Sequence, residues 1–197
     1  ESMYLQAIEN TNVMADSVEN FELDTSLKYP ILYGSREEDN RMFRETINRK
    51  FKDKVDNGII PQEQVEAFEA ALEEEQRVFK KIEMDGFMLS MSELISWCKD
   101  NDIAVGNARG SVGGSRVAYV TDVIDLNPET WHTVFSRFAN EDRKEVGDID
   151  VDVIFEDRPR IFEYIINRFG IPKTAKVPSF GTLADKTAYG FVMKYFE

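Results

Sequence analysis

Apolar residues recur every three or four positions along most of this chain, which is the period of an amphipathic helix. The helices predicted from this pattern cover residues 1–20, 37–55, 61–81, 92–98, 117–123, 128–138, 159–169 and 182–196. Local signals agree with some of these ends, because Ser35 can cap a helix and Asn57-Gly58 can stop one. Pro61 is well placed to open the helix that follows.

Three short stretches have the pattern of strands instead. Residues 103–105 are an apolar run that leads into a glycine-rich turn, residues 149–155 carry alternating aspartates, and residues 176–180 form the third stretch. Within the helix predicted over 61–81, the run Glu73-Glu74-Glu75 is typical of a solvated helix face. The whole pattern predicts an α+β fold in which helices dominate.

Composition limits the kinds of protein that this chain can be. Its 197 residues are enough for one sizeable core, and a single cysteine cannot form an internal disulfide, which fits a reducing compartment. One cysteine and one histidine nearly exclude a structural zinc site. No stretch approaches a membrane span and the first ten residues lack the features of a secretion signal, so we expect a soluble cytoplasmic protein.

The formal net charge of −13 argues against a module that binds nucleic acid by itself, because such surfaces are usually basic. The charge is compatible with an active-site domain whose carboxylates hold metal ions while other domains bind the nucleic acid. The chain shows no obvious cap or tail at either end, so we expect it to be part of a longer protein.

The segment 109–115 has the composition of a phosphate-binding turn. Its glycines let the backbone approach a ligand closely, and a helix that begins within the turn favours an anion at its start. Ser111 and Ser115 offer hydroxyl groups, and Arg109 offers a bidentate guanidinium. The spacing fits neither a P-loop nor a dinucleotide-binding fingerprint. A flexible connection is the alternative, but the preceding strand, the arginine and the serines favour phosphate binding.

Asp148, Asp150 and Asp152 alternate with apolar residues on the second predicted strand. Alternate residues of a strand share a face at a spacing of roughly 7 Å, so the three carboxylates would stand together and repel one another. Bound Mg²⁺ or Mn²⁺ would offset that repulsion and favours this arrangement. A charged edge strand is the alternative, although lysine is the more usual residue there.

Three blocks of the sequence resemble the palm domain of bacterial C-family replicative DNA polymerases, the DNA polymerase III alpha subunits. The blocks are VGNARGSVGGSRVAYVTDVIDLNP, FSRFANEDR and GDIDVD, and their order and spacing match as well. The resemblance is strong over residues 103–195 and weaker over 1–102. The tail GTLADKTAYGFV is closer to the Gram-positive branch and the middle to the Gram-negative form, which predicts a divergent member, with a phage as one source.

The resemblance implies a palm of the DNA polymerase beta-like nucleotidyltransferase type, present in part, with flanking helices. It implies that Asp148 and Asp150 ligate two catalytic Mg²⁺ ions, for which Mn²⁺ can substitute, and that Asp152 supports them. It also implies that Gly110 and Ser111 contact the incoming triphosphate and that Arg109 shapes the turn. The remaining residues that it assigns are Ser115, Arg137 and Arg143 to the nucleotide and Lys186 to DNA.

The resemblance divides the chain into four parts: the end of a preceding domain (1–33), a helical approach (34–102), the palm core (103–172) and the start of a thumb (173–197). In the family a third catalytic aspartate lies farther along the palm, so we expect it beyond Glu197. Two departures stand out. Gly147 replaces a proline before the first aspartate, and Asn107-Ala108 replaces a Pro-Gly pair.

The implied function is template-directed DNA synthesis by two-metal-ion nucleotidyl transfer, with primer–template DNA and deoxynucleoside triphosphates as substrates. A sliding clamp and other replisome proteins are expected to bind through domains outside this chain, and no membrane is expected as a partner. The isolated 197-residue chain is expected to bind DNA weakly and to be inactive. Two alternatives remain, a non-templated nucleotidyltransferase with the same turn and aspartate pair, and a non-catalytic palm-like module.

Overall fold

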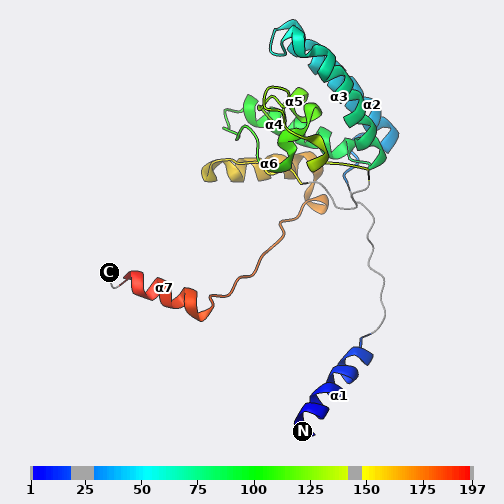
Figure 1. Ribbon diagram of the computed structural model, residues 1–197. Helices are drawn as coiled ribbons and strands as arrows, with labels where there is room; N and C mark the ends of the chain where they lie inside the picture. Colours follow the sequence, from blue (N-terminus) through cyan, green and yellow to red (C-terminus); the bar gives the residue numbers. More distant parts are fainter. Residues whose placement is uncertain (1, 19–28, 142–147, 196–197) are drawn as a thin grey trace.

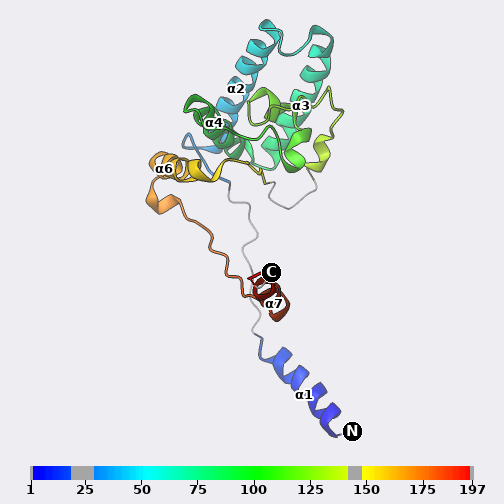
Figure 2. The ribbon, with the colours of Figure 1, turned by 90° about the vertical axis from the view of Figure 1, so that its left-hand side faces the viewer.

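The computed structural model describes residues 2–18, 29–141 and 148–195 (Figures 1 and 2). Its α-helices are α1 (Ser2–Asp16), α2 (Arg36–Asp56), α3 (Val65–Lys81), α4 (Asp85–Asp100), α5 (Arg116–Val120), α6 (Arg158–Phe169) and α7 (Asp185–Tyr195). Its 3-10 helices are η1 (Gln62–Gln64), η2 (Gly110–Gly114), η3 (Phe135–Arg137), η4 (Phe155–Asp157) and η5 (Ile171–Lys173). The predicted dominance of helix is therefore confirmed.

One hydrophobic core lies among α2, α3, α4 and α5. Apart from Arg116, the short helix α5 is buried, and its residues Val117, Ala118 and Val120 are fully so, as expected of a helix surrounded by protein. Phe43 of α2 and Phe68 of α3 are also fully buried in this core. In Figures 1 and 2 the α2–α3 pair forms one end of the body, and α6 lies at the other.

The ends of α2 follow the signals in the sequence. The Ser35 side chain accepts a hydrogen bond from the backbone N–H of Glu38 at 3.1 Å, and the helix ends at Asn57. Helix α4 begins at Asp85 rather than at residue 92 as predicted, so Gly86 lies inside the helix. A Cβ atom at Gly86 would lie 2.3 Å from the carbonyl oxygen of Pro30, so glycine here permits a close approach between two segments.

The helix predicted over residues 128–138 is wrong. The side-chain oxygen of Asn127 accepts hydrogen bonds from the backbone N–H groups of Glu129 and Thr130, as a helix cap does, but only one turn forms. His132 then has a φ of +49°, and the chain forms only the short η3 before the core residue Phe138.

Among the described residues, β pairing is limited to one antiparallel bridge between Val105 and Val153. The predicted strands 103–105 and 149–155 therefore lie side by side but pair at a single position, and residues 176–180 form no strand. Two short strands are marginal without further neighbours, and aspartate is a poor strand former. The sheet of a palm domain remains a prediction.

Helices α1 and α7 bury no residues and lie apart from the body in both views (Figures 1 and 2). Helix α6 docks on α4 through the stacked rings of Trp97 and Tyr164, whose centroids are 4.4 Å apart. Across the described part of the chain, every helix is too short or too polar to cross a membrane.

Candidate functional site

The glycine-rich turn has an exposed rim and a buried base. Arg109 and Gly110 are exposed and Ser111 is half-buried, whereas residues 112–115 are buried. Gly110 has a φ of +73°, a conformation that favours glycine. A ligand can therefore reach the rim, Arg109–Ser111, while the base belongs to the protein interior.

A buried carboxylate of α3 holds the base of the turn. Glu75 is 1% exposed, and its Oε2 accepts hydrogen bonds from the Ser115 hydroxyl at 2.7 Å and from the backbone N–H of Val117 at 3.0 Å. Its Oε1 accepts a hydrogen bond from the backbone N–H of Arg116 at 2.9 Å. Burial raises the pKa of Glu75 to about 7, although these hydrogen bonds act to lower it.

The segment after α5 also holds the base. The guanidinium of Arg116 pairs with Glu129 at 2.7 Å and donates hydrogen bonds to the carbonyl groups of Gly114 and Thr133, both at 3.0 Å. The Thr133 hydroxyl donates to the carbonyl of Gly113 at 2.8 Å. The turn is thus attached both to α3 and to the chain that precedes η3.

The aspartate segment runs alongside the rim of the turn. Asp148, Asp150 and Asp152 are exposed while the residues between them are half-buried, so the three carboxylates alternate as predicted for an extended segment. The backbone N–H of Gly106 donates to the carbonyl of Asp152 at 2.9 Å. Asp150 faces the turn, because its Oδ2 would lie 3.6 Å from a Cβ atom built on Gly110.

Arg109 links the turn to two of the aspartates. Its guanidinium lies 2.7 Å from Oδ1 of Asp152 and 3.6 Å from Oδ2 of Asp150. The hydrogen bond with Asp152 and the charges of both aspartates raise the pKa of Arg109. All three side chains are more than half exposed, so water and salt screen these ion pairs.

Comparison with known proteins gives the same family that the three sequence blocks resemble. Residues 41–197 match the family model described as the bacterial DNA polymerase III alpha NTPase domain. This chain belongs to the bacterial DNA polymerase III alpha family. Among curated members, the DNA polymerase III subunit alpha of Aquifex aeolicus is 32% identical over 188 residues, which are 94% of this chain and 16% of that protein. The subunit alpha of Escherichia coli K12 is 35% identical over 136 residues, 64% of this chain and 12% of that protein.

The chain therefore spans about one-sixth or less of the DNA polymerase III alpha subunits that it matches. A third relative, the subunit alpha of Campylobacter jejuni, is 33% identical over 152 residues, 77% of this chain and 12% of that protein. These relatives are bacterial and give no support to a phage origin.

Few side chains of this DNA polymerase III alpha segment are placed to ligate a metal ion. Within residues 2–18, 29–141 and 148–195, no group of three or more histidine, cysteine, aspartate or glutamate side chains is arranged to hold a metal ion. Asp148 and Asp150 nevertheless provide exposed carboxylate oxygens, and Asp150 is next to the turn. Mg²⁺ commonly binds through one or two carboxylates together with substrate phosphates and water, so the residues present fit that cation.

The other predicted nucleotide and DNA residues have different positions. The Ser115 side chain is fully buried against Glu75 rather than at the rim. Arg137 is exposed in η3, and Lys186 is exposed in α7, away from the body in Figures 1 and 2. Arg143 lies outside the described residues, as does Gly147. The structure therefore groups Arg109, Gly110 and Asp150.

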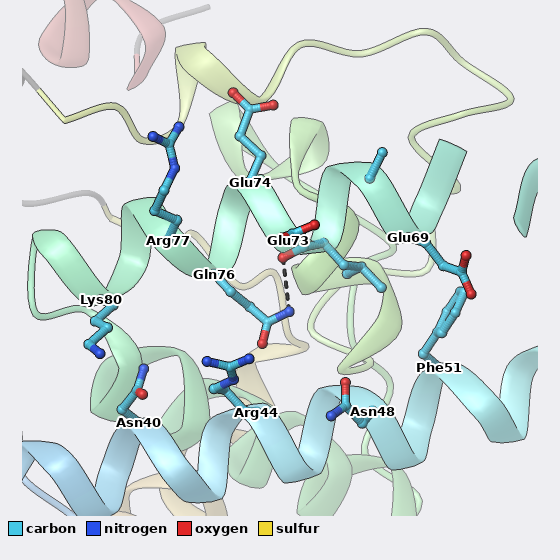
Figure 3. A pocket seen from close by; sticks show the side chains of 12 residues that line it. Asn40, Arg44, Asn48, Phe51, Glu69, Glu73, Glu74, Gln76, Arg77 and Lys80 are labelled. Atoms are coloured by element: carbon cyan, nitrogen blue, oxygen red, sulfur yellow. Dashed lines mark hydrogen bonds between the residues drawn. The ribbon is translucent and has the colours of Figure 1, made fainter. Parts of the chain in front are cut away.

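A separate groove of about 880 Å³ opens between α2 and α3 (Figure 3). In Figure 3 the side chains of Arg44 and Gln76 point toward each other from the two helices. The charged side chains that line the groove are Arg44, Arg77, Lys80, Glu69, Glu73 and Glu74. Equal numbers of acidic and basic groups give no preference for an anion, and no residue of the turn or of the aspartate segment lines the groove.

The prediction that Glu73-Glu74-Glu75 forms a solvated helix face is wrong for Glu75. Glu73 and Glu74 are exposed, but Glu75 is among the most buried residues of the protein. The signal was its register, because Glu75 lies three residues after Leu72 and three before Val78 on the buried stripe of α3. A carboxylate on an apolar stripe indicates a specific buried partner.

Proposed function

We propose that this segment supplies the triphosphate-binding and metal-binding part of a template-directed DNA polymerase. The observation that carries the proposal is the position of Asp150 beside the rim: its Oδ2 lies 3.6 Å from the Arg109 guanidinium and would lie 3.6 Å from a Cβ built on Gly110. A phosphate bound at the rim would then be within reach of a cation held by Asp150. Membership of the bacterial DNA polymerase III alpha family supports this choice over other phosphate-binding functions.

Each residue of the rim has a part in this proposal. Gly110 and Ser111 bind oxygens of the incoming deoxynucleoside triphosphate, since glycine allows the backbone to come close and Ser111 offers a hydroxyl. Arg109 neutralises Asp152 and Asp150 before the nucleotide binds. Its guanidinium has five N–H donors, so it can keep an aspartate and still bind a phosphate oxygen.

Asp148 and Asp150 would hold the divalent cations, and Asp152, which pairs with Arg109, supports them. Two ions held there would supply positive charge to the triphosphate and would lower the pKa of the primer 3′-hydroxyl. The chain's own residues orient the reacting groups, and none of them acts as a covalent nucleophile. Arg137 and Arg143 are assigned to the nucleotide side and Lys186 to DNA, with the clamp and replisome contacts in other parts of the longer protein.

The test is nucleotide addition on a primed DNA template with Mg²⁺ by the complete polymerase that contains this segment. Asp148→Ala and Asp150→Ala should each reduce the rate by at least about 1000-fold, because each removes a ligand that acts only in the reaction. Both variants should keep the melting temperature of the wild type, because each relieves repulsion on an exposed segment. The control is Glu156→Ala, which removes an exposed carboxylate from the next segment and should keep full activity.

Retained addition in either aspartate variant would contradict the assignment. Addition by the wild type that does not depend on the template would instead identify a non-templated nucleotidyltransferase. A wild-type chain that binds triphosphate but never transfers a nucleotide would identify a non-catalytic module.

A further inference from the structure

We propose that Glu75 is a positioning residue for the reaction at the turn. Its carboxylate fixes the start of α5 and thereby holds the rim, Arg109–Ser111, against Asp150. The effect on nucleotide addition rests on the function proposed above, whereas the effect on the conformation of the turn does not.

The first turn of α5 depends on side chains for its backbone hydrogen bonds. The first N–H groups of a helix have no partner within the helix, and a helix of five residues is too short to be stable alone. Glu75 accepts hydrogen bonds from the N–H groups of Arg116 and Val117, and the Ser115 hydroxyl accepts one from Ala118 at 3.0 Å. That hydroxyl in turn donates to Glu75, so one carboxylate organises all three groups.

A displacement at Ser115 would reach the rim because the turn between them has little freedom. Val112 is fully buried in the core, and a Cβ atom at Gly114 would lie 2.4 Å from the carbonyl oxygen of Val134. The base of the turn is therefore close-packed, and a shift at one end moves the rest. At the other end the rim meets Asp150, so the spacing between phosphate and carboxylate depends on where Ser115 is held.

Glu75→Gln tests this chemistry with almost no change in volume. A glutamine has a single acceptor oxygen, and its NH₂ group faces backbone donors, so at least one buried N–H would lose its partner. The matched control is Glu74→Gln, one residue earlier on the same helix, where the side chain is exposed and lines the groove between α2 and α3 (Figure 3).

Two measurements on the full-length chain, both at pH 8, decide the proposal. Amide hydrogen exchange should become at least about tenfold faster over residues 110–120 in Glu75→Gln and should not change in Glu74→Gln. In primer extension, Glu75→Gln should raise the KM for nucleotide by about tenfold or more, while the Kd for primer–template stays within about twofold. A merely structural role would reduce the amount of active protein without changing the KM of what remains.

Three outcomes are informative. Unchanged exchange over residues 110–120 would overturn the proposal whatever the activity. Faster exchange with unchanged nucleotide kinetics would overturn the positioning role. If the wild type adds no nucleotide at all, the proposed function fails instead. The Kd for a deoxynucleoside triphosphate with Mg²⁺ then replaces the KM, and it should rise about tenfold in Glu75→Gln. An unchanged Kd would overturn the proposal.

Discussion

Two adjacent glycines in the turn differ in the space around them. A Cβ atom at Gly113 would meet its nearest neighbour at 3.9 Å, an ordinary contact. At Gly114 the same atom would lie 2.4 Å from the carbonyl oxygen and 2.6 Å from the carbonyl carbon of Val134, which are backbone atoms that cannot rotate away. At Gly114, at the base of the turn, glycine is therefore needed for close packing.

Gly114→Ala should lower the free energy of unfolding by about 2 kcal/mol, because overpacking against fixed backbone costs about 1–3 kcal/mol. Gly113→Ala is the matched control and should change it by less than about 1 kcal/mol. Chemical denaturation of both variants measures the difference. Equal losses would show that the backbone of residues 133–135 adapts and that Gly114 is not required for close packing.

At this scale the sequence predicted the alternation of the aspartates but not the surroundings of single side chains. The alternation of Asp148, Asp150 and Asp152 was predictable because a period of two is a property of extended chains. The interior position of Ser115 was not, because it depends on Glu75, which is 40 residues away in the sequence. Long-range partners of this kind leave only indirect traces, such as an acidic residue on an apolar stripe.

The end of α5 is fixed by an ionic cluster that joins it to α2. Lys50 and Lys54 lie 2.8 and 2.6 Å from the carboxylate of Asp122, and the side chains of both lysines are largely buried. Lys50 also donates to the carbonyl of Thr121 at 3.1 Å, as does Ser92 of α4 at 2.6 Å. The cluster therefore connects three helices at one point.

Asp122→Ala should lower the free energy of unfolding at pH 7 by about 3 kcal/mol, since it leaves two largely buried lysines without their partner. Burial acts to raise the pKa of Asp122, but the two lysines outweigh it and hold the pKa below its usual 3.8. The contribution is therefore complete at neutral pH and lost as the pH falls below that value, so the wild type and the variant should converge in acid.

Denaturant titrations from pH 7 to pH 3 check this prediction. Asp53→Ala is the control, because Asp53 pairs with Arg49 at 3.8 Å on the exposed face of α2 and should change stability by less than about 1 kcal/mol. A difference between wild type and Asp122→Ala that grows in acid would contradict the account.

Among the elements, long helices with capping signals were predictable and irregular segments were not. Helix α2 begins after Ser35 and ends at Asn57, because local side chains determine both ends. The segment 128–138 has apolar residues at helical spacing, but its side chains instead serve the packing of the turn and the core. Local periodicity cannot separate these two uses of apolar residues.

The whole molecule combines a shared core with an acidic surface. The core draws on α2 and α3, within the predicted helical approach, and on α5, within the predicted palm. The net charge of −13 opposes binding of a polyanion to the surface as a whole, so it gives no support to DNA binding by this segment alone. Within this chain, Arg109 offsets part of the negative charge of Asp150 and Asp152, which the proposed triphosphate site requires.

The central claim is that the rim of the turn and the aspartate segment form one site for a metal-bound triphosphate. Iron-directed cleavage tests it most directly. Fe²⁺ replaces Mg²⁺ in the complete polymerase with nucleotide and primer–template, and added hydrogen peroxide is reduced at the ion to hydroxyl radicals that cut the nearby backbone. The account predicts cuts within residues 106–111 and within residues 148–152, both suppressed by excess Mg²⁺ and lost in Asp150→Ala. Cuts confined to one segment, or cuts that persist in Asp150→Ala, would contradict it.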